Sequence, residues 1–312
     1  MYIYSAFASD RFSYINDLIS KTEYVFFLVG SSGNGKNYLM KKIGKYFENK
    51  STYFFCSFDN DSLDGVLIDK KILVFDSVYP HNVLPRLYKI DGEIINLGDG
   101  IDVPNNEFGY IKSIFTKEKD AKYEYIKYGT ILHNLLDIEY NYYDNLSLQS
   151  QKNQIKDLVD SLKFKDYNNI IKDVFYLKEY TGSKNKISIN CSNKMLAEYL
   201  LKNMDKLIYN KGIQHITYHN PYNEKFVKAI ETDNFYIGTN QSYGQNIDIY
   251  GENIIDSINT IQIEAKINKI KKEALYLHKK LERAYRPYID FENNDRLYEQ
   301  IINKTNKIIG RI

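Results

Sequence analysis

Residues 24–37, YVFFLVGSSGNGKN, decide the fold. The aromatic and branched residues from 24 to 29 form a run that is apolar on both faces, which predicts a buried parallel strand. The run stops at Gly30, and beyond the glycine-containing segment Leu39, Ile43 and Phe47 recur every four residues, which is helical spacing. A strand, a glycine-rich loop and a helix in this order predict the beginning of an α/β sheet.

The flanking sequence extends this pattern. Residues 52–57 (TYFFCS) and 71–76 (KILVFD) are short apolar runs that predict a second and a third buried strand. The pattern becomes helical from 108 to about 164, and strands return at 186–190, 215–218 and 235–238. Two helices are expected at about 257–285 and 292–309. We therefore expect an α/β fold of the P-loop NTPase type, with a parallel sheet flanked by helices.

The order of predicted elements repeats along the chain. Asp76 ends the third predicted strand, and Gly238 ends its counterpart in the second half. The helical segments match as well. The first contains Leu132-His133 followed by Tyr140 and Tyr143, and the second contains Leu277-His278 followed at the same spacing by Tyr285 and Tyr288. We expect a tandem duplication, although chance matching between abundant Tyr and Leu is the alternative. Residues 1–165 would form a P-loop nucleotide-binding domain with a helical tail, and residues 166–312 a degenerate P-loop-like α/β domain with its own tail.

The spacing Gly30-x-x-x-x-Gly35-Lys36 is the phosphate-binding loop pattern. Glycines at 30, 33 and 35 let the backbone turn so that several N–H groups point at an anion, and the N-terminus of the following helix adds partial positive charge. Lys36 would reach the β and γ phosphates. The nucleotide-binding residues expected from this pattern are Gly30, Ser31, Ser32, Gly33, Asn34, Gly35, Lys36, Asn37 and Tyr38.

Two residues are candidates for holding Mg²⁺. The position after the lysine normally carries Ser or Thr, whose hydroxyl ligates Mg²⁺, and here it is Asn37. An amide oxygen can ligate the metal but lies one bond further out, and Mg²⁺ tolerates poor octahedral geometry badly. Asp76 is the expected carboxylate on the metal side, on a strand predicted to neighbour the one that leads to Lys36. The alternative for Asp76 is an ordinary strand-end aspartate that caps a turn.

An acidic segment, residues 59–65 (DNDSLDG), follows the second predicted strand. Ligands gather at the carboxyl ends of strands in open α/β sheets, so Asp59, Asp61 and Asp64 are candidate catalytic residues together with Lys36 and Asp76. One of the three could act as a general base or contact the substrate, and a solvated turn is an equally weighted alternative. His81 is expected on the same edge, where it could sense the γ phosphate or simply belong to a loop.

The second half of the sequence lacks the glycine-rich loop and the strand-end aspartate of the first half. Residues 189–194 (INCSNK) join a predicted strand to a helix without a glycine, so the backbone cannot wrap a triphosphate. Gly238 stands where the first half has an aspartate. We expect this half to be a structural or regulatory partner.

Composition limits the partners. The 312 residues carry 42 Lys plus Arg and 40 Asp plus Glu, so the net charge of +2 gives no general reason to expect nucleic acid or an anionic membrane. The two cysteines, Cys56 and Cys191, are too few for a disulfide framework and fit a reducing compartment. No apolar run approaches the roughly 20 residues of a membrane span, and the first residues lack a basic region leading into an apolar one. We expect a cytoplasmic protein.

Four stretches together resemble an uncharacterised bacterial family of tandem P-loop ATP-binding proteins that are assigned as ATPases or nucleotide kinases. They are residues 25–44 (VFFLVGSSGNGKNYLMKKIG), 54–85, 93–102 (EIINLGDGID) and 277–301 (LHKKLERAYRPYIDFENNDRLYEQI). The resemblance implies ATP as the ligand, carried by Gly30, Gly33, Gly35, Lys36 and Asp76. Members usually have Ser or Thr after the lysine and often a second intact loop, so this chain would be a degenerate member with a single site.

Three functions remain open from the sequence. The first is an ATP-binding P-loop ATPase, a hydrolase that is slow or stimulated by a partner, with ATP and Mg²⁺ as cofactors. The second is a small-molecule or nucleotide kinase that uses an aspartate of residues 59–65 to orient an acceptor hydroxyl. The third is a non-catalytic, nucleotide-dependent scaffold. The expected partners are a nucleotide and an unidentified small molecule or protein.

Overall fold

The computed structural model describes residues 3–5, 7–9, 12–56, 59, 61–79, 81–85, 87, 89–164, 172–174, 182, 184–239, 244–250 and 260–310. The chain forms two compact units: the first comprises Ile3–Tyr128 and Ala265–Ile312, and the second comprises Gly129–Glu264. Two helices, α3 (Phe108–Asn145) and α6 (Thr260–Tyr285), contribute residues to both units. The boundary expected between residues 165 and 166 lies outside the described residues, and the compact units divide the chain elsewhere.

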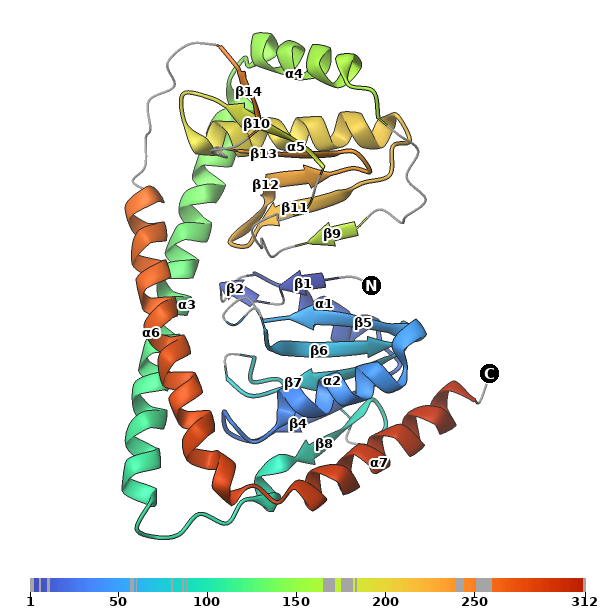
Figure 1. The fold of residues 1–312 in the computed structure, drawn as a ribbon, viewed down its shortest axis with the longest axis vertical. Helices are drawn as coiled ribbons and strands as arrows, with labels where there is room; N and C mark the ends of the chain where they lie inside the picture. Colours follow the sequence, from blue (N-terminus) through green and yellow to red (C-terminus); the bar gives the residue numbers. More distant parts are fainter. Residues whose placement is uncertain are drawn as a thin grey trace. The chain divides into compact units, whose positions relative to one another are not determined.

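A six-stranded sheet forms the centre of the first unit, in the order β1-β5-β6-β7-β4-β8 (Figure 1). The strands are β1 (Ile3–Ser5), β4 (Tyr24–Val29), β5 (Ser51–Phe55), β6 (Leu63–Ile68), β7 (Ile72–Asp76) and β8 (Gly92–Asn96). The predicted strands at 24–29, 52–57 and 71–76 and the α/β class are confirmed. β4 lies between β7 and the edge strand β8 and runs parallel to both, so the glycine-rich segment emerges between two neighbouring strand ends.

The prediction of a parallel sheet is wrong because β6 runs antiparallel to β5 and β7. The seven residues between the end of β5 and the start of β6 are too few for a crossover helix, so β6 can only fold back beside β5. Residues 69–71 then join β6 to β7 in a tight turn, which the N–H of Lys71 closes by donating to the Ile68 carbonyl at 3.0 Å, and its two central residues, Asp69 and Lys70, are both in the left-handed region at φ 51° and 58°. Such turns match the twist of antiparallel strands. The first sheet is therefore mixed.

Helices cover both faces of this sheet. α2 (Lys36–Tyr46) and α7 (Phe291–Ile309) pack on one face (Figure 1), where Ile43 of α2 and Ile301 of α7 are fully buried against Phe26 of β4. Helix α1 (Tyr14–Lys21) lies on the other face, where Leu18 packs with Phe27 and Phe75. A small hairpin of β2 (Phe7–Ser9) and β3 (Phe12–Ser13) precedes α1.

Two long helices complete the first unit. Ile111 and Ile114 of α3 pack with Leu281 and Tyr285 of α6, and Leu281 is fully buried. This contact fixes the parts of α3 and α6 that belong to the first unit against one another. Because α6 also contacts the glycine-rich segment, the pair brings residues from distant parts of the sequence to the end of β4.

The second unit is built on another six-stranded mixed sheet, in the order β9-β11-β12-β13-β10-β14. Its strands are β9 (Lys172–Val174), β10 (Asn185–Asn190), β11 (Ile216–Asn220), β12 (Asn223–Glu231), β13 (Phe235–Thr239) and β14 (Gln245–Asp248). Helix α5 (Lys194–Asn210) follows β10 and packs on β12, and α4 (Gln149–Ser161) lies against α5. The strand order and the relative directions match those of the first sheet pair by pair.

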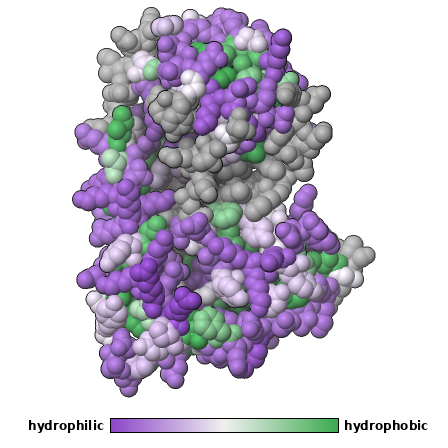
Figure 2. Space-filling model, in the orientation of Figure 1, coloured by the Kyte–Doolittle hydropathy of each residue, from purple (hydrophilic) through white to green (hydrophobic). Residues whose placement is uncertain are grey.

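The described helices include none with the length and apolar content needed to cross a bilayer. On the face shown in Figure 2, hydrophilic residues predominate and hydrophobic residues are scattered among them. A surface of this kind exposes single apolar side chains rather than one broad apolar area.

Candidate functional site

The segment between β4 and α2 turns through three glycines with positive φ. Gly30, Gly33 and Gly35 have φ of 139°, 94° and 88°, values that residues with a Cβ adopt at a cost. Helix α2 begins immediately afterwards at Lys36, with Gly35 as its N-terminal cap. The backbone N–H groups of the first helical turn have no partner within the helix, and together with the helix dipole they favour an anion at this end.

A polar side chain holds the turn from within. Asn34 is only 2% exposed, and its side-chain amide lies 2.9 Å from Ser31 Oγ. The backbone N–H of Asn34 also donates to the Ser31 carbonyl at 3.3 Å. These contacts close the loop on itself and stabilise its turn.

Lys36 lies folded back over the same loop. Its Nζ donates to the carbonyls of Gly30 at 2.6 Å and Ser31 at 3.0 Å, and lies 3.8 Å from Asp76 Oδ2. The side chain is 7% exposed, and this burial lowers the pKa of Lys36. The negative charge of Asp76 acts in the other direction but has the smaller effect. The ammonium group is thus held where the loop, β4 and β7 meet. The prediction that the strand leading to Lys36 lies beside the strand ending in Asp76 is confirmed, because β4 pairs with β7.

Asp76 is the last residue of β7 and pairs with Leu28 of β4. Its Oδ1 accepts a hydrogen bond from the N–H of Val78 at 3.2 Å, which is the turn-capping role weighed as the alternative. Oδ2 faces Lys36 instead. The carboxylate is partly exposed, at 22%, so one oxygen remains directed toward the loop while the other fixes the chain after β7.

Asn37 uses its amide to connect α2 with the acidic segment. Its Oδ1 accepts a hydrogen bond from the N–H of Leu63 at 3.1 Å, and its Nδ2 lies 3.5 Å from Ser62 Oγ. The oxygen predicted to ligate Mg²⁺ is therefore engaged by the backbone of β6. Asp76 fits a divalent cation better, because one of its oxygens faces the loop.

Clusters of three or more His, Cys, Asp or Glu that could hold a metal are absent among the described residues. Mg²⁺ usually keeps several waters and binds through one or two carboxylates plus substrate phosphates, so such a cluster is not required for a metal that arrives with a nucleotide. The Mg²⁺ site at Asn37 and Asp76 stays a prediction.

The three aspartates of residues 59–65 occupy different positions. Asp59 accepts hydrogen bonds from the Asp61 N–H at 3.1 Å and from Ser62 Oγ at 2.7 Å, and so stabilises the turn before β6. Asp61 is exposed, and its carbonyl accepts from Lys41 Nζ at 2.6 Å. Asp64 lies within β6, not in a loop, and is 5% exposed. Of the three, Asp64 is the carboxylate that the fold buries.

Asp64 faces His81. The Nε2 of His81 lies 3.5 Å from Asp64 Oδ1, and the ring packs edge-on against Phe75. Burial alone would lower the pKa of His81, but the charge of Asp64 and its hydrogen bond raise the pKa above the ordinary value. Asp64 therefore stabilises the charged form of the His81 imidazole, at the edge of the sheet where β6 begins and β7 ends.

Helices α3 and α6 add a group of residues that sequence reasoning did not assign to the site. Glu118 Oε1 accepts from Ser32 Oγ at 2.9 Å, lies 2.7 Å from Lys122 Nζ and lies 2.8 Å from His278 Nδ1. His278 Nε2 is also 3.5 Å from Glu282 Oε1. The repeated Leu-His pair at 277–278 was the available signal, but it marked only a matching helix and gave no indication of a contact with Ser32.

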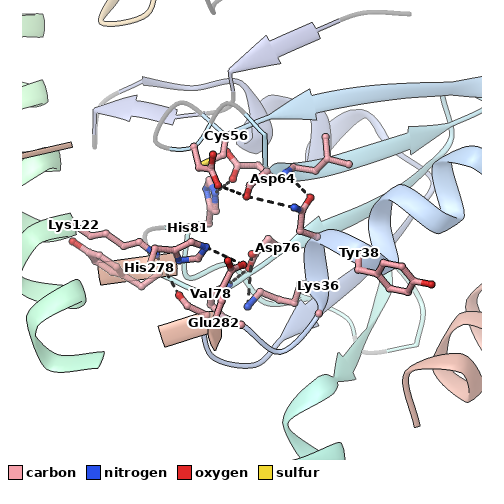
Figure 3. A pocket seen from close by; sticks show the side chains of 18 of the residues that line it. Lys36, Tyr38, Cys56, Asp64, Asp76, Val78, His81, Lys122, His278 and Glu282 are labelled. Carbon is pink, nitrogen blue, oxygen red and sulfur yellow. Dashed lines mark hydrogen bonds and ion pairs between the residues drawn. The ribbon is translucent and has the colours of Figure 1, made fainter. Parts of the chain in front are cut away.

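These groups surround one cavity of about 230 Å³ (Figure 3). It is smaller than the roughly 300–1,000 Å³ of pockets that enclose a drug-sized ligand, so its size suits the phosphate chain of a nucleotide better than the whole molecule. Tyr38 reaches its edge and is 59% exposed, and Asp61 is not among the described lining residues. The lining that concerns the site consists of Ser32, Gly33, Gly35, Lys36, Asn37, Asp59, Asp64, Asp76, His81, Lys122, His278 and Glu282.

The matching position of the second unit has no such cavity-forming loop between β10 and α5. Only residues 191–193 join them, and Asn193 caps α5 by accepting from the Leu196 N–H at 2.6 Å. Lys194, the first residue of α5, pairs with Glu264 at 2.8 Å. In the sheet register, Thr239 lies opposite Ile189 as Asp76 lies opposite Leu28, so the carboxylate is missing and Thr239, instead of Gly238, takes its place.

Comparison with protein-family models, with curated proteins and with solved structures found no match to this chain. The resemblance to a tandem P-loop family therefore stays a prediction, and the function has to be argued from the residues of this chain.

Proposed function

We propose that the first unit binds ATP through residues 30–37 and hydrolyses it slowly or when a partner stimulates it. The observation that carries this proposal is the loop itself: three glycines with positive φ lead from β4, which is flanked by two parallel strands, into a helix whose first residue is the buried Lys36. Backbone N–H groups, a helix N-terminus and a lysine ammonium are the groups that P-loops use for polyphosphate. A cytoplasmic location, where ATP is abundant, belongs to the same proposal.

Lys36 would exchange partners when the nucleotide binds. In the structure its Nζ donates hydrogen bonds to the carbonyls of two loop residues, Gly30 and Ser31. Phosphate oxygens are stronger acceptors for an ammonium than neutral carbonyls, so the β and γ phosphates would take over these hydrogen bonds. The loop keeps its shape through Ser31 and Asn34 and needs little reorganisation.

Asp76 and Asp64 have distinct proposed roles. Asp76, with one oxygen directed toward the loop, would hold the waters of the Mg²⁺ that accompanies ATP, and the metal would supply charge neutralisation for the phosphates. Asp64 is the best placed of the three acidic candidates to orient an attacking water, because it is buried, lines the cavity and is positioned by His81. Asp59 instead stabilises the turn, and Asp61 is exposed.

A non-catalytic nucleotide-dependent scaffold is the second candidate, and one contact favours it. The Asn37 oxygen that would ligate the metal is bound to the Leu63 N–H, so the loop lacks an available ligand after its lysine. Phosphate binding tolerates this better than turnover does. Among the described residues, no comparable contact favours the kinase function.

The matching strand order of the two units supports the further proposal that the chain arose by tandem duplication. Helices follow the corresponding strands in both, α2 after β4 and α5 after β10. Under this proposal the second unit has lost its loop and its carboxylate and serves a structural or regulatory role.

The test measures nucleotide binding and phosphate release by the full chain. Titration calorimetry with the β,γ-imido analogue of ATP and Mg²⁺ should show binding that Lys36→Ala removes and that Lys45→Ala, an exposed lysine on the same helix, leaves intact. Slow release of phosphate from ATP supports the ATPase, binding without release supports the scaffold, and transfer of the γ phosphate to a small acceptor supports the kinase. Equal binding by wild type and Lys36→Ala would refute the assigned site.

A further inference from the structure

The side chains of Glu118, Lys122, His278 and Glu282, which we call the helix cluster, form a charge network beside the loop. Lys122 and His278 both contact Glu118, and His278 also contacts Glu282. Figure 3 shows Lys122, His278 and Glu282 on one side of the pocket, with Lys36 and Asp76 beside them. Two helices that are far apart in the sequence, α3 and α6, thus deliver two cations and two anions to one place.

Hydrogen bonds and neighbouring charges stabilise the charged forms of Glu118 and His278 against the effect of burial. Glu118 is 2% exposed, and although burial favours its neutral form, the hydrogen bond from His278 and the charge of Lys122 lower the pKa of Glu118 to about 2. Burial opposes the charge of His278 as well, but its hydrogen bonds to Glu118 and Glu282 raise the pKa of the imidazole. Each of the two basic side chains thus contacts a carboxylate, and these contacts favour the charged form of His278.

The helix cluster is joined directly to the phosphate-binding loop. Ser32 Oγ donates to Glu118 at 2.9 Å, and Lys122 Nζ lies 3.4 Å from the same hydroxyl. A Cβ added to Gly33 would lie 2.9 Å from Glu282 Cα, so the backbone of α6 touches the loop. The charges of Lys122, Glu118 and Glu282 also act on the pKa of Lys36. Residues of the loop and three members of the helix cluster, Lys122, His278 and Glu282, line the same cavity.

We propose that Lys122 and His278 bind the terminal phosphate of a nucleoside triphosphate, exchanging Glu118 and Glu282 for it, so that the helix cluster distinguishes a triphosphate from a diphosphate. This inference rests on the proposed nucleotide binding at residues 30–37. The loop and Lys36 would hold the phosphate chain at the N-terminus of α2, and the terminal phosphate would be within reach of α3 and α6 as well, because Lys122 Nζ lies 3.4 Å from Ser32 Oγ of the loop. A phosphate group, with its multiple negative charge, attracts an ammonium and an imidazolium more strongly than a carboxylate does.

The first experiment compares the affinities of the full chain for the β,γ-imido analogue of ATP and for ADP, each with Mg²⁺, by titration calorimetry. Losing one charged hydrogen bond to phosphate in Lys122→Met or His278→Gln should weaken triphosphate binding at least about tenfold and change ADP binding by less than about twofold. Lys119→Met removes the same charge from an exposed position on the same helix and should change neither affinity.

Glu282→Gln gives a result of opposite sign. Its carboxylate competes with the phosphate for His278, so its removal should tighten triphosphate binding by about threefold and leave ADP binding unchanged. A cluster that only clamps α6 onto the loop would give no gain. Glu282 is the most exposed member, so this variant decides the matter if the two cation variants fail to fold.

The outcomes separate the two proposals. Wild-type protein that binds neither nucleotide overturns the proposed function and this inference with it. Wild-type protein that binds both, with the same triphosphate-to-diphosphate ratio in Lys122→Met, His278→Gln and Glu282→Gln, overturns only the inference. Loss of triphosphate affinity in the cation variants together with a gain in Glu282→Gln establishes it.

Discussion

Lys36 Nζ donates a 2.6 Å hydrogen bond to the carbonyl of Gly30, so that the first residue of α2 closes the loop from which it emerges. The contact is made inside the protein, where burial lowers the pKa of Lys36 although Asp76 lies 3.8 Å away. A lowered pKa means that the charged ammonium is less stable in the folded chain than in the unfolded one. The buried charge of Lys36 is therefore maintained at some expense to the stability of the folded chain.

From this relationship we expect Lys36→Met to remove nucleotide binding without unfolding the protein. The methionine fills a similar volume and removes a desolvated charge, while Asp76 is 22% exposed and can be hydrated. The free energy of unfolding should change by no more than about 1 kcal/mol. Urea denaturation without nucleotide measures this change, and a loss of several kcal/mol would show that Lys36 has a structural role instead.

Asn37→Thr tests whether the amide limits turnover. A hydroxyl at this position lies one bond closer to the backbone than the amide oxygen, where P-loops carry the group that would hold Mg²⁺, and phosphate release should rise at least about tenfold if ligation is the defect. The Leu63 N–H loses its acceptor, which should cost about 1 kcal/mol of stability.

Asn37→Ala is the matched control for this substitution. It removes the same acceptor without adding a hydroxyl, so its stability should fall by a similar amount while phosphate release stays at the wild-type level. If Asn37→Thr releases phosphate no faster than wild type, the amide is not what limits turnover.

The pH dependence of stability should show the contribution of Glu118. Its pKa falls from an ordinary 4.5 to about 2 on folding, so the stabilisation is fully present above about pH 4.5 and is lost as the pH falls toward 2. The shift corresponds to at most about 3 kcal/mol. Denaturation of wild type and Glu118→Gln between pH 2 and 7 measures the difference, which should shrink on the acid side. A difference that is constant across this range would contradict the charge state assigned to Glu118.

His278 should act in the opposite direction. Folding raises its pKa, so its contribution is fully present below the ordinary pKa of about 6.5 and is lost as the pH rises through the folded value. The stability difference between wild type and His278→Gln should therefore decrease on the alkaline side. The contact between Lys122 and Glu118 does not involve His278, so this part of the cluster should persist.

The sequence predicted those parts of the site that are local in the chain. β4, the loop and α2 are contiguous, and β7 with Asp76 is a compact apolar run, so periodicity and glycine spacing were sufficient. β6 was missed because its turn uses Asp69 and Lys70 at positive φ, where the usual signal is Asn or Gly. The expected loop at 59–65 in fact ends in this strand.

The helix cluster could not be predicted, for a different reason. Glu118 and His278 lie 160 residues apart, and only the packing of α3 on α6 brings them together. Each residue by itself looks like part of a charged helix surface, and the periodicity of one helix says nothing about which residues another helix will face.

Gly33→Ala tests the contact between the loop and α6. Gly33 has φ 94°, and the added Cβ would lie 2.9 Å from Glu282 Cα, a backbone atom that cannot move aside like a side chain. Strain and the displaced helix should together cost about 1–3 kcal/mol of stability. Gly109→Ala is the matched control, because its Cβ meets nothing within 4 Å and Gly109 lies in helix α3. Alanine there should raise stability by up to about 1 kcal/mol. Denaturation of both variants measures these changes, and equal effects of the two substitutions would show that α6 does not rest on the loop as described.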